Sequence, residues 1–205
     1  MTATAPPMVP TVPVAPPAAR SRGRDIGWWG MVVVIATEGT IFLGLLSTYF
    51  FLRASAPRWP PTRIELPELP LISVFSVVLI ASSIPIFWAE AGIRAGRQAT
   101  LRIGLLISFI MGAAFLGHQA YEYSKLTFGW TDNAYGSIFF VTTGLHGLHV
   151  LVGLLMNLVV QAKAWSRKLS SDRHVSMQVF SLYWHFVDGV WLFVFASLYL
   201  SPHLR

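Results

Sequence analysis

The sequence contains no cysteine. This absence excludes disulfide bonds, thiolate metal ligands and a cysteine nucleophile. Charged residues are also scarce, because they make up only 12% of the 205 residues, whereas a soluble domain carries about a quarter. So few charges cannot cover a globular core with a solvated surface, while 54% of the residues are hydrophobic. The composition therefore indicates a membrane protein.

The net charge of +6 does not by itself indicate a nucleic-acid partner. Lysine and arginine occur in short segments between apolar runs, and they form no basic stripe with interleaved aromatic residues. We therefore interpret them as signals of membrane topology and expect no nucleic-acid binding.

The first 25 residues are rich in proline, alanine and threonine. Such a composition cannot bury a core or hold a helix, so we expect residues 1–25 to form a disordered cytoplasmic tail before a membrane domain of residues 26–205. The tail has no apolar run after a charged start, and its prolines do not allow an amphipathic helix. These features are not those of a secretory signal or a mitochondrial transit peptide, and they favour the bacterial plasma membrane.

Five apolar runs follow, at residues 27–52, 71–91, 103–123, 135–161 and 177–200. Each reaches the roughly 20 residues that a helix needs to cross a hydrocarbon core of about 30 Å. Lipid offers no partner for an unpaired backbone group, so each run must be helical. The predicted fold is an all-α membrane protein, a bundle of five transmembrane helices. Pro85 predicts a kink in the second helix.

The distribution of lysine and arginine predicts the orientation of this bundle. With a cytoplasmic N-terminus, ten of these residues lie inside and five lie outside, which agrees with the positive-inside rule. We therefore expect the N-terminus in the cytoplasm and the C-terminus outside. The inside residues are Arg20, Arg22, Arg24, Arg94, Arg97, Arg102, Lys163, Arg167, Lys168 and Arg173, and the outside residues are Arg53, Arg58, Arg63, Lys125 and Arg205.

Several ionisable side chains lie inside the predicted helices, where they are costly and need a partner or a function. Glu38 lies 11 residues after Gly27, which is about 16 Å along a helix. His146 and Asp188 lie equally far into the fourth and fifth helices, and His149 and His185 are one turn from them. We therefore predict a buried polar layer made of Glu38, His146, His149, His185 and Asp188.

Two interpretations of this layer remain open. It can be a hydrogen-bond network that fixes the register of the helices, as intramembrane polar groups often do. It can also be a proton relay, an anchor for a lipid headgroup or a metal site. Against a metal, no Glu-x-x-His pair recurs on two helices, as di-iron bundles require.

The last helix carries large side chains along one stripe. Trp184, Asp188, Trp191 and Phe195 are spaced by four, three and four residues, which places them on one helical face. Such a stripe is usually a packing surface. The aspartate within it indicates that this face meets protein or a bound lipid.

Four motifs resemble one known family. The run from Trp28 to Arg53 carries a single acidic residue, Glu38, and TTGLHGLHVLVGLLMN contains His146 and His149 in a His-Gly-x-His-Val pattern. YWHFVDGVWLFVF contains His185 and Asp188, and AFLGHQAYEY has the form Gln-x-x-Glu-Tyr at its end. Together they resemble subunit III of the haem–copper terminal oxidases, from Trp28 to the C-terminus.

This resemblance implies a non-catalytic subunit without a metal or cofactor of its own. The subunit would pack against subunit I, in a complex with subunit II and other members, and haem and copper would lie in those partners. The implied function is to stabilise subunit I and to support proton uptake in a proton-pumping complex that transfers electrons from cytochrome c to O2.

The chain departs from the longer members of the family in one respect. Those members have seven helices, and their first two enclose a phospholipid-holding cleft with the other five. No apolar sequence for such a pair precedes Trp28. Phospholipids are still expected partners, but the complete cleft is not.

Alternative functions also fit the sequence. Five-helix relatives serve in quinol oxidases and as an accessory subunit of nitric oxide reductase. A stand-alone proton or ion transporter could use the same polar layer, although transporters of this kind have inverted repeats and broken helices, and the sequence has neither.

Overall fold

The computed structural model describes residues 25–61 and 64–203. Apart from Asp25, the predicted tail of residues 1–25 therefore lies outside the described residues. So do Arg63 and Arg205, which the predicted orientation also counted.

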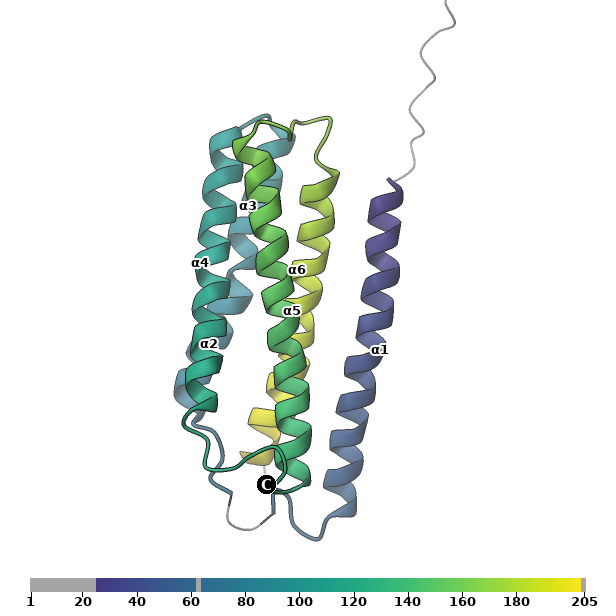
Figure 1. Cartoon of the computed structure of the whole chain (residues 1–205), viewed down its shortest axis with the longest axis vertical. Helices are drawn as coiled ribbons and strands as arrows, with labels where there is room; N and C mark the ends of the chain where they lie inside the picture. The colour runs from purple at the N-terminus through teal and green to yellow at the C-terminus, as the bar shows by residue number, and fades with distance from the viewer. Residues whose placement is uncertain (1–24, 62–63, 204–205) are drawn as a thin grey trace, which may run out of the picture.

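The described chain is helical. Its elements are α1 (Ile26–Ser55), α2 (Leu69–Ala81), α3 (Ser83–Arg94), α4 (Gln98–Tyr123), α5 (Ala134–Trp165) and α6 (Val175–Val194), followed by a π-helical turn (Phe195–Leu200) and a 3-10 turn (Ser201–His203) (Figure 1). Five segments are long and apolar enough to span a membrane, with α2 and α3 together forming the second. Within the described ranges there is no strand, only an isolated bridge between Ser170 and Arg173. The predicted five-helix, all-α fold is confirmed.

The second span is divided at Ser82, between α2 and α3. Pro85 has no N–H to donate to the carbonyl of Ala81, and its ring crowds that carbonyl, so a regular helix cannot continue through this point. At the break, the Ser82 hydroxyl donates to the Leu79 carbonyl at 2.5 Å. The break occurs where the proline predicts a kink, and it turns Ser82 and Ser83 toward α6.

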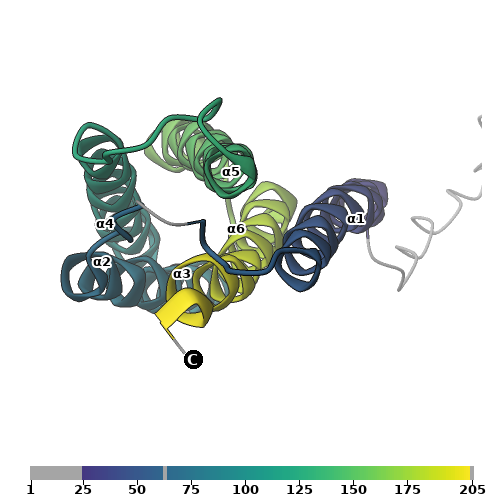
Figure 2. The same cartoon turned by 90° about the horizontal axis from the view of Figure 1, so that it is seen from below.

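The helices do not pack equally. In Figure 2, α1 lies at one edge beside α5 and α6, and α2 and α4 lie at the other. Only Phe42 and Tyr49 are buried on α1, both in its C-terminal half, whereas α5 has fifteen buried residues. The N-terminal half of α1 thus has no buried residue, although Gly27 in its first turn lies near Val175 of α6 (Figure 1).

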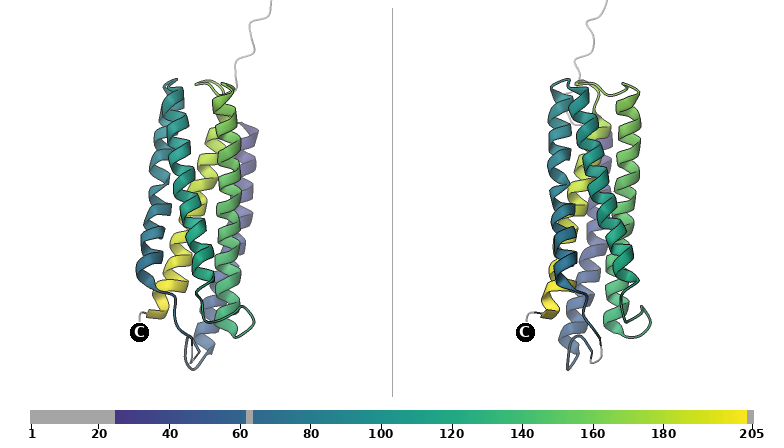
Figure 3. Two further views of the ribbon diagram at one scale, coloured as in Figure 1. Left: turned by 60° about the vertical axis from the view of Figure 1, so that its left-hand side comes forward. Right: turned by 90° about the vertical axis from the view of Figure 1, so that its left-hand side faces the viewer.

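The two ends of the bundle differ in charge. The start of α1, the α3–α4 turn and the α5–α6 connection lie together, and the other connections and the C-terminal turn lie at the opposite end (Figures 1 and 3). Of the ten lysines and arginines in the described ranges, seven belong to the first end and three to the second. The seven are Arg94, Arg97, Arg102, Lys163, Arg167, Lys168 and Arg173, and the three are Arg53, Arg58 and Lys125.

Candidate functional site

Glu38 of α1 is bound to His149 of α5 within the membrane-spanning part of the bundle. Oε2 of Glu38 lies 3.2 Å from Nε2 of His149. The side chain of His149 is 10% exposed and that of Glu38 is 33% exposed. The ring of Phe42 packs edge-on against His149, with ring centroids 5.1 Å apart. One carboxyl therefore joins two helices, and part of it remains open at the side of α1.

The hydrogen bonds of His149 determine how many protons this pair holds. Nδ1 lies 2.8 Å from the carbonyl of Leu145, which can only accept, so Nδ1 carries a proton. The contact at Nε2 then needs one further proton, placed either on Glu38 or on the imidazole. In both cases the pair holds one shared proton and has no net charge, which suits an apolar environment.

A second group lies between α3 and α6. The Ser83 hydroxyl lies 2.5 Å from Oδ2 of Asp188 and 2.8 Å from Nδ1 of His185. Phe87 stacks on the imidazole of His185, with ring centroids 4.2 Å apart. Asp188 is 6% exposed, and its Oδ1 has no partner among the described residues. Ser83 thus links the two predicted site residues of the last helix.

The same group continues toward the α3–α4 end of the bundle. The hydroxyl of Ser181 lies 3.2 Å from Nε2 of His185 and 3.1 Å from Oε2 of Glu90. The other oxygen of Glu90 forms an ion pair with Arg94. His185 is therefore hydrogen-bonded through both ring nitrogens, each time to a serine that also contacts a carboxyl group.

His146 has a different environment. It is fully buried, and neither ring nitrogen has a hydrogen-bond partner within the described ranges. Its ring lies between the aromatic rings of Trp191, Phe115 and Phe42, at centroid distances of 4.7, 6.0 and 6.4 Å. These rings leave the imidazole enclosed by apolar groups.

The five residues of the predicted polar layer thus fall into three sets. Glu38 pairs with His149, His185 and Asp188 share Ser83, and His146 lies in an aromatic enclosure. In the part of the chain that the structure describes, no hydrogen bond joins one set to another. Whether the layer has a function stays a prediction.

The residues of the aromatic stripe are held by serines of the second span. The indole N–H of Trp184 donates to Ser82 at 2.8 Å, and that of Trp191 donates to Ser76 at 2.9 Å. Both tryptophans are fully buried, and Phe195 is partly buried against the same core. These bonds fix the rotation of α6, and with it the direction in which Asp188 points.

Two residues that link the second group, Ser83 and Ser181, were not predicted from the sequence. A signal for Ser181 was present, because it lies four residues before His185 and so on the same helical face. Nothing in the sequence pairs Ser83 with Asp188, since that contact depends on how α3 and α6 rotate against each other.

No group of three or more histidine, aspartate or glutamate side chains suited to a metal ion occurs in the described ranges. The donor chemistry agrees with this geometry. His149 and His185 use both ring nitrogens in hydrogen bonds, so neither offers a free lone pair without losing a partner.

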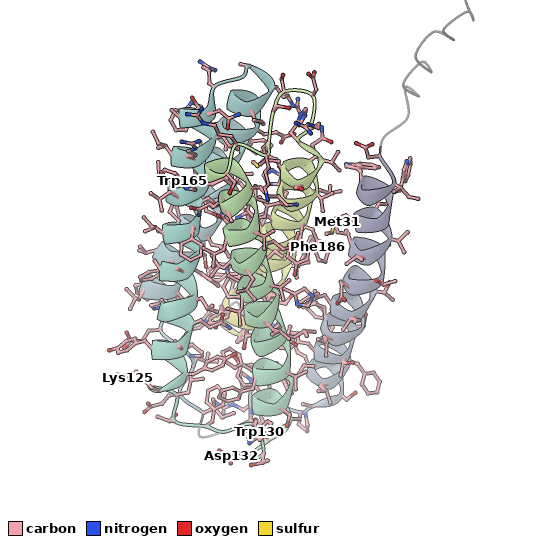
Figure 4. All side chains as sticks on the ribbon, turned by 45° about the horizontal axis from the view of Figure 1, so that its top comes forward. Met31, Lys125, Trp130, Asp132, Trp165 and Phe186 are labelled. Carbon is pink, nitrogen blue, oxygen red and sulfur yellow. The ribbon has the colours of Figure 1, made fainter. Side chains whose placement is uncertain are left out.

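A separate pocket of about 510 Å³ lies near the start of α1. Its walls are mostly apolar side chains of α5 and α6, and Lys163 stands among them, donating to Ser176 at 2.7 Å. The pocket reaches α1 at Gly27. Figure 4 shows Met31 and Phe186 between α1 and α6 further along, and the ring of Phe186 lies against Gly39 of α1.

Comparison with known proteins gives one family. The family model described as cytochrome c oxidase subunit III matches residues 23–202. Cytochrome c oxidase subunit 3 of Synechocystis is 40% identical over 180 residues, which is 86% of this chain and 76% of that protein. The subunit 3 of Thermostichus vulcanus is 35% identical over 172 residues, or 83% and 85% of the two chains. That of Spodoptera frugiperda is 39% identical over 145 residues, or 69% and 97%.

Proposed function

The chain belongs to the cytochrome c oxidase subunit III family, and from this membership we propose that it is a non-catalytic subunit of a proton-pumping haem–copper oxidase. Its complex transfers electrons from cytochrome c to O2. The chain stabilises subunit I and supports proton uptake, and subunit II and other members complete the complex. Haem and copper lie in the partner subunits.

The contacts made by the ring nitrogens of the intramembrane histidines support a non-catalytic role. In His149 and His185, both ring nitrogens form hydrogen bonds with serine, carboxyl or carbonyl groups. His146 is enclosed by three aromatic rings. A metal or haem ligand needs a free imidazole nitrogen that points into an open site. These side chains are instead arranged to hold helices together, as a supporting subunit requires.

Phospholipid is the second proposed partner, and the pocket beside α1 suits it. Valine, leucine and methionine side chains line the pocket and fit an acyl chain, and Lys163 lies at the charged end of the bundle. A lysine near a membrane surface attracts an anionic headgroup by about 1 kcal/mol. The shallow packing of α1 leaves room that a lipid fills.

The proposed orientation has the N-terminus in the cytoplasm and the C-terminus outside. Seven of the ten described lysines and arginines belong to the end at which α1 begins, and cytoplasmic ends carry the excess of positive charge. We also propose that residues 26–205 are one membrane domain behind the N-terminal tail, and that the membrane is the bacterial plasma membrane.

Purification of the complex through a tag on this chain tests the proposed function. We expect subunit I with haem spectra and a copper-bearing subunit II to co-purify, and oxidation of cytochrome c by O2. A quinol oxidase would lack the copper of subunit II, and a nitric oxide reductase would reduce nitric oxide. If the chain purified alone and transported protons into liposomes, the proposal would be wrong.

A further inference from the structure

Five side chains form a continuous hydrogen-bonded row between α3 and α6, which we call the α3–α6 polar chain. In order it contains Glu90, Ser181, His185, Ser83 and Asp188, with successive contacts of 3.1, 3.2, 2.8 and 2.5 Å. The row runs from the last turns of α3 into the interior of the bundle. We propose that the α3–α6 polar chain holds one mobile proton, shared among Glu90, His185 and Asp188 and exchanged with water at Glu90.

The number of protons follows from what each group can donate. Each serine hydroxyl has one proton to give, and an ionised carboxylate has none. When Glu90 and Asp188 are both ionised, Ser181 and Ser83 must each donate to the neighbouring carboxylate. Both serines can then only accept from His185. All four contacts are therefore satisfied only when the imidazole carries a proton on each nitrogen.

The same proton can occupy either end without breaking a contact. When it lies on Oδ2 of Asp188, Asp188 donates to Ser83, Ser83 donates to Nδ1 of His185, and Nε2–H donates to Ser181. The mirror arrangement places the proton on Glu90 and leaves His185 with its hydrogen on Nδ1. Three positions of one proton thus give the same number of hydrogen bonds, which is the condition for easy transfer.

Any other number of protons costs a hydrogen bond. With no mobile proton, one serine donates its hydrogen to a carboxylate and lies beside the unprotonated nitrogen of His185. That contact then has no hydrogen and is lost as a hydrogen bond. With two, the extra proton must lie on Oδ1 of Asp188, which has no partner within the described ranges, or on the Glu90 oxygen that pairs with Arg94. A buried polar group left without its partner costs about 1–3 kcal/mol.

The balance of charge agrees with one mobile proton when the ion pair of Glu90 with Arg94 is counted. Arg94 and a protonated His185 are positive, and Glu90 and Asp188 are negative, so the group with one mobile proton is neutral. Burial favours a neutral group over a charged one. No competing charge comes from α2, which has no ionisable residue, and the Glu38 carboxyl of α1 is engaged by His149 of α5. On α5, His146 is enclosed by aromatic rings and Lys163 is bound to Ser176. The ionisable groups of α4 also have other partners: Arg102 donates to the Ala164 carbonyl, His118 stacks on Phe75, and Glu122 accepts from Tyr199.

The exposed end of the row is Glu90. Its side chain is 15% exposed, and that of its partner Arg94 is 61% exposed, whereas Asp188 is 6% exposed. When the row has lost its mobile proton to water and His185 keeps its hydrogen on Nδ1, a proton from water binds Glu90 and passes to Ser181, while the proton of Ser181 passes to Nε2 of His185. The proton on Nδ1 then passes to Ser83, and the proton of Ser83 passes to Asp188. One proton leaves the water, one is gained by Asp188, and the intermediates regain their original number.

The inference deepens the proposed support of proton uptake and rests on it for its biological purpose, but its test does not require an active oxidase. Nitrogen NMR of the full chain with ¹⁵N-labelled histidine, in lipid bilayers, distinguishes the neutral forms of His185 from imidazolium. A His185→Asn variant identifies the His185 signal. Carbon NMR reports in parallel whether Asp188 and Glu90 are protonated.

The proposal predicts opposite tautomers of His185 in two amide variants. In Asp188→Asn the amide N–H₂ donates to Ser83, and a neutral His185 with its hydrogen on Nε2 completes the row. In Glu90→Gln the amide donates to Ser181, and the hydrogen of a neutral His185 moves to Nδ1. The control is Asp172→Asn in the α5–α6 connection, which leaves His185 as in the native chain.

In the native chain, we expect the fractions of the mobile proton found on Glu90, His185 and Asp188 to add up to one. A neutral His185 beside two ionised carboxylates, or the same tautomer in both amide variants, would overturn the proposal. Each amide variant is a separate test, so failure of one to fold leaves the other decisive. Absence of an oxidase partner would contradict the proposed function and leave these tautomers unchanged.

Discussion

Gly153 of α5 lies directly against the indole ring of Trp184 on α6. A Cβ built at Gly153 would be 2.7 Å from Cε3 and Cζ3 of that ring. Gly112 of α4 faces the other side of the same indole, where a Cβ would lie 2.7 Å from Cη2. Trp184, one of two fully buried tryptophans in the described ranges, therefore lies between two glycines and joins three helices.

This contact predicts that Gly153→Ala destabilises the bundle. The alanine methyl cannot be accommodated unless Trp184 moves, and that movement would strain its bond to Ser82. Overpacking of this kind costs about 1–3 kcal/mol. Thermal unfolding of the purified protein in lipid nanodiscs measures the effect.

Gly117→Ala is the matched control. Gly117 is on α4, and no heavy atom lies within 4 Å of a Cβ built there. Since alanine has the higher helix propensity, this variant should melt at or above the native temperature. Equal melting of the Gly153 and Gly117 variants would contradict the close contact with Trp184.

A second prediction concerns Glu38. In Glu38→Ala, Nε2 of His149 loses its partner in a site that is largely closed to water, so we expect a loss of about 1–3 kcal/mol and a shorter turnover lifetime of the complex. Glu65→Ala changes an exposed carboxylate and should have no such effect. Melting of the complex and the decline of its activity during turnover are the measurements.

Glu38→Gln separates the contact with His149 from the shared proton. The amide can donate to Nε2 of His149 while Nδ1 still donates to Leu145, so the contact survives without a shared proton. Glutamine should therefore restore most of the stability that alanine removes. If the alanine variant retained all subunits, native melting and native turnover lifetime, the Glu38–His149 contact would have no importance for the complex.

The sequence predicted the spans well, because hydropathy over some twenty residues is set by the membrane and not by tertiary packing. It also predicted the break near Pro85, since a missing N–H is a local property. The depth of a side chain likewise follows from the rise per residue. These properties require no knowledge of how the helices meet.

The rotation of each helix about its axis could not be predicted in the same way. His146 and His149 are three residues apart, so they point about 60° apart around α5; one lies among aromatic rings and the other contacts α1. Which serine reaches Asp188 depends on the hydrogen bonds that the tryptophans of α6 donate to Ser76 and Ser82. Such long-range contacts leave no periodic signal in the chain.

A third prediction tests the orientation, and the lack of native cysteine makes it simple. Ser166→Cys places a thiol at the end where α5 finishes, and Ser124→Cys places one at the opposite end; both positions are exposed. A membrane-impermeant maleimide added to intact spheroplasts should label only the second. Labelling of Ser166→Cys alone would show that the orientation is reversed.

The last prediction concerns the pocket beside α1. Removing the ammonium group in Lys163→Ala should weaken binding of an anionic phospholipid there, by about 1 kcal/mol or roughly fivefold. Native mass spectrometry in mild detergent, with added phosphatidylglycerol, counts the bound lipids. Lys168→Ala is the control, because Lys168 is exposed and does not line the pocket.

Val159→Trp provides the complementary change. Val159 lines the pocket and is 56% exposed, so an indole at this position fills the space of the acyl chain without disturbing the buried core. If lipid binds in this pocket, both variants lose it, one through the headgroup and the other through the chain. Loss only in Lys163→Ala would indicate binding of the headgroup at the surface, and loss in neither would rule out lipid at this pocket.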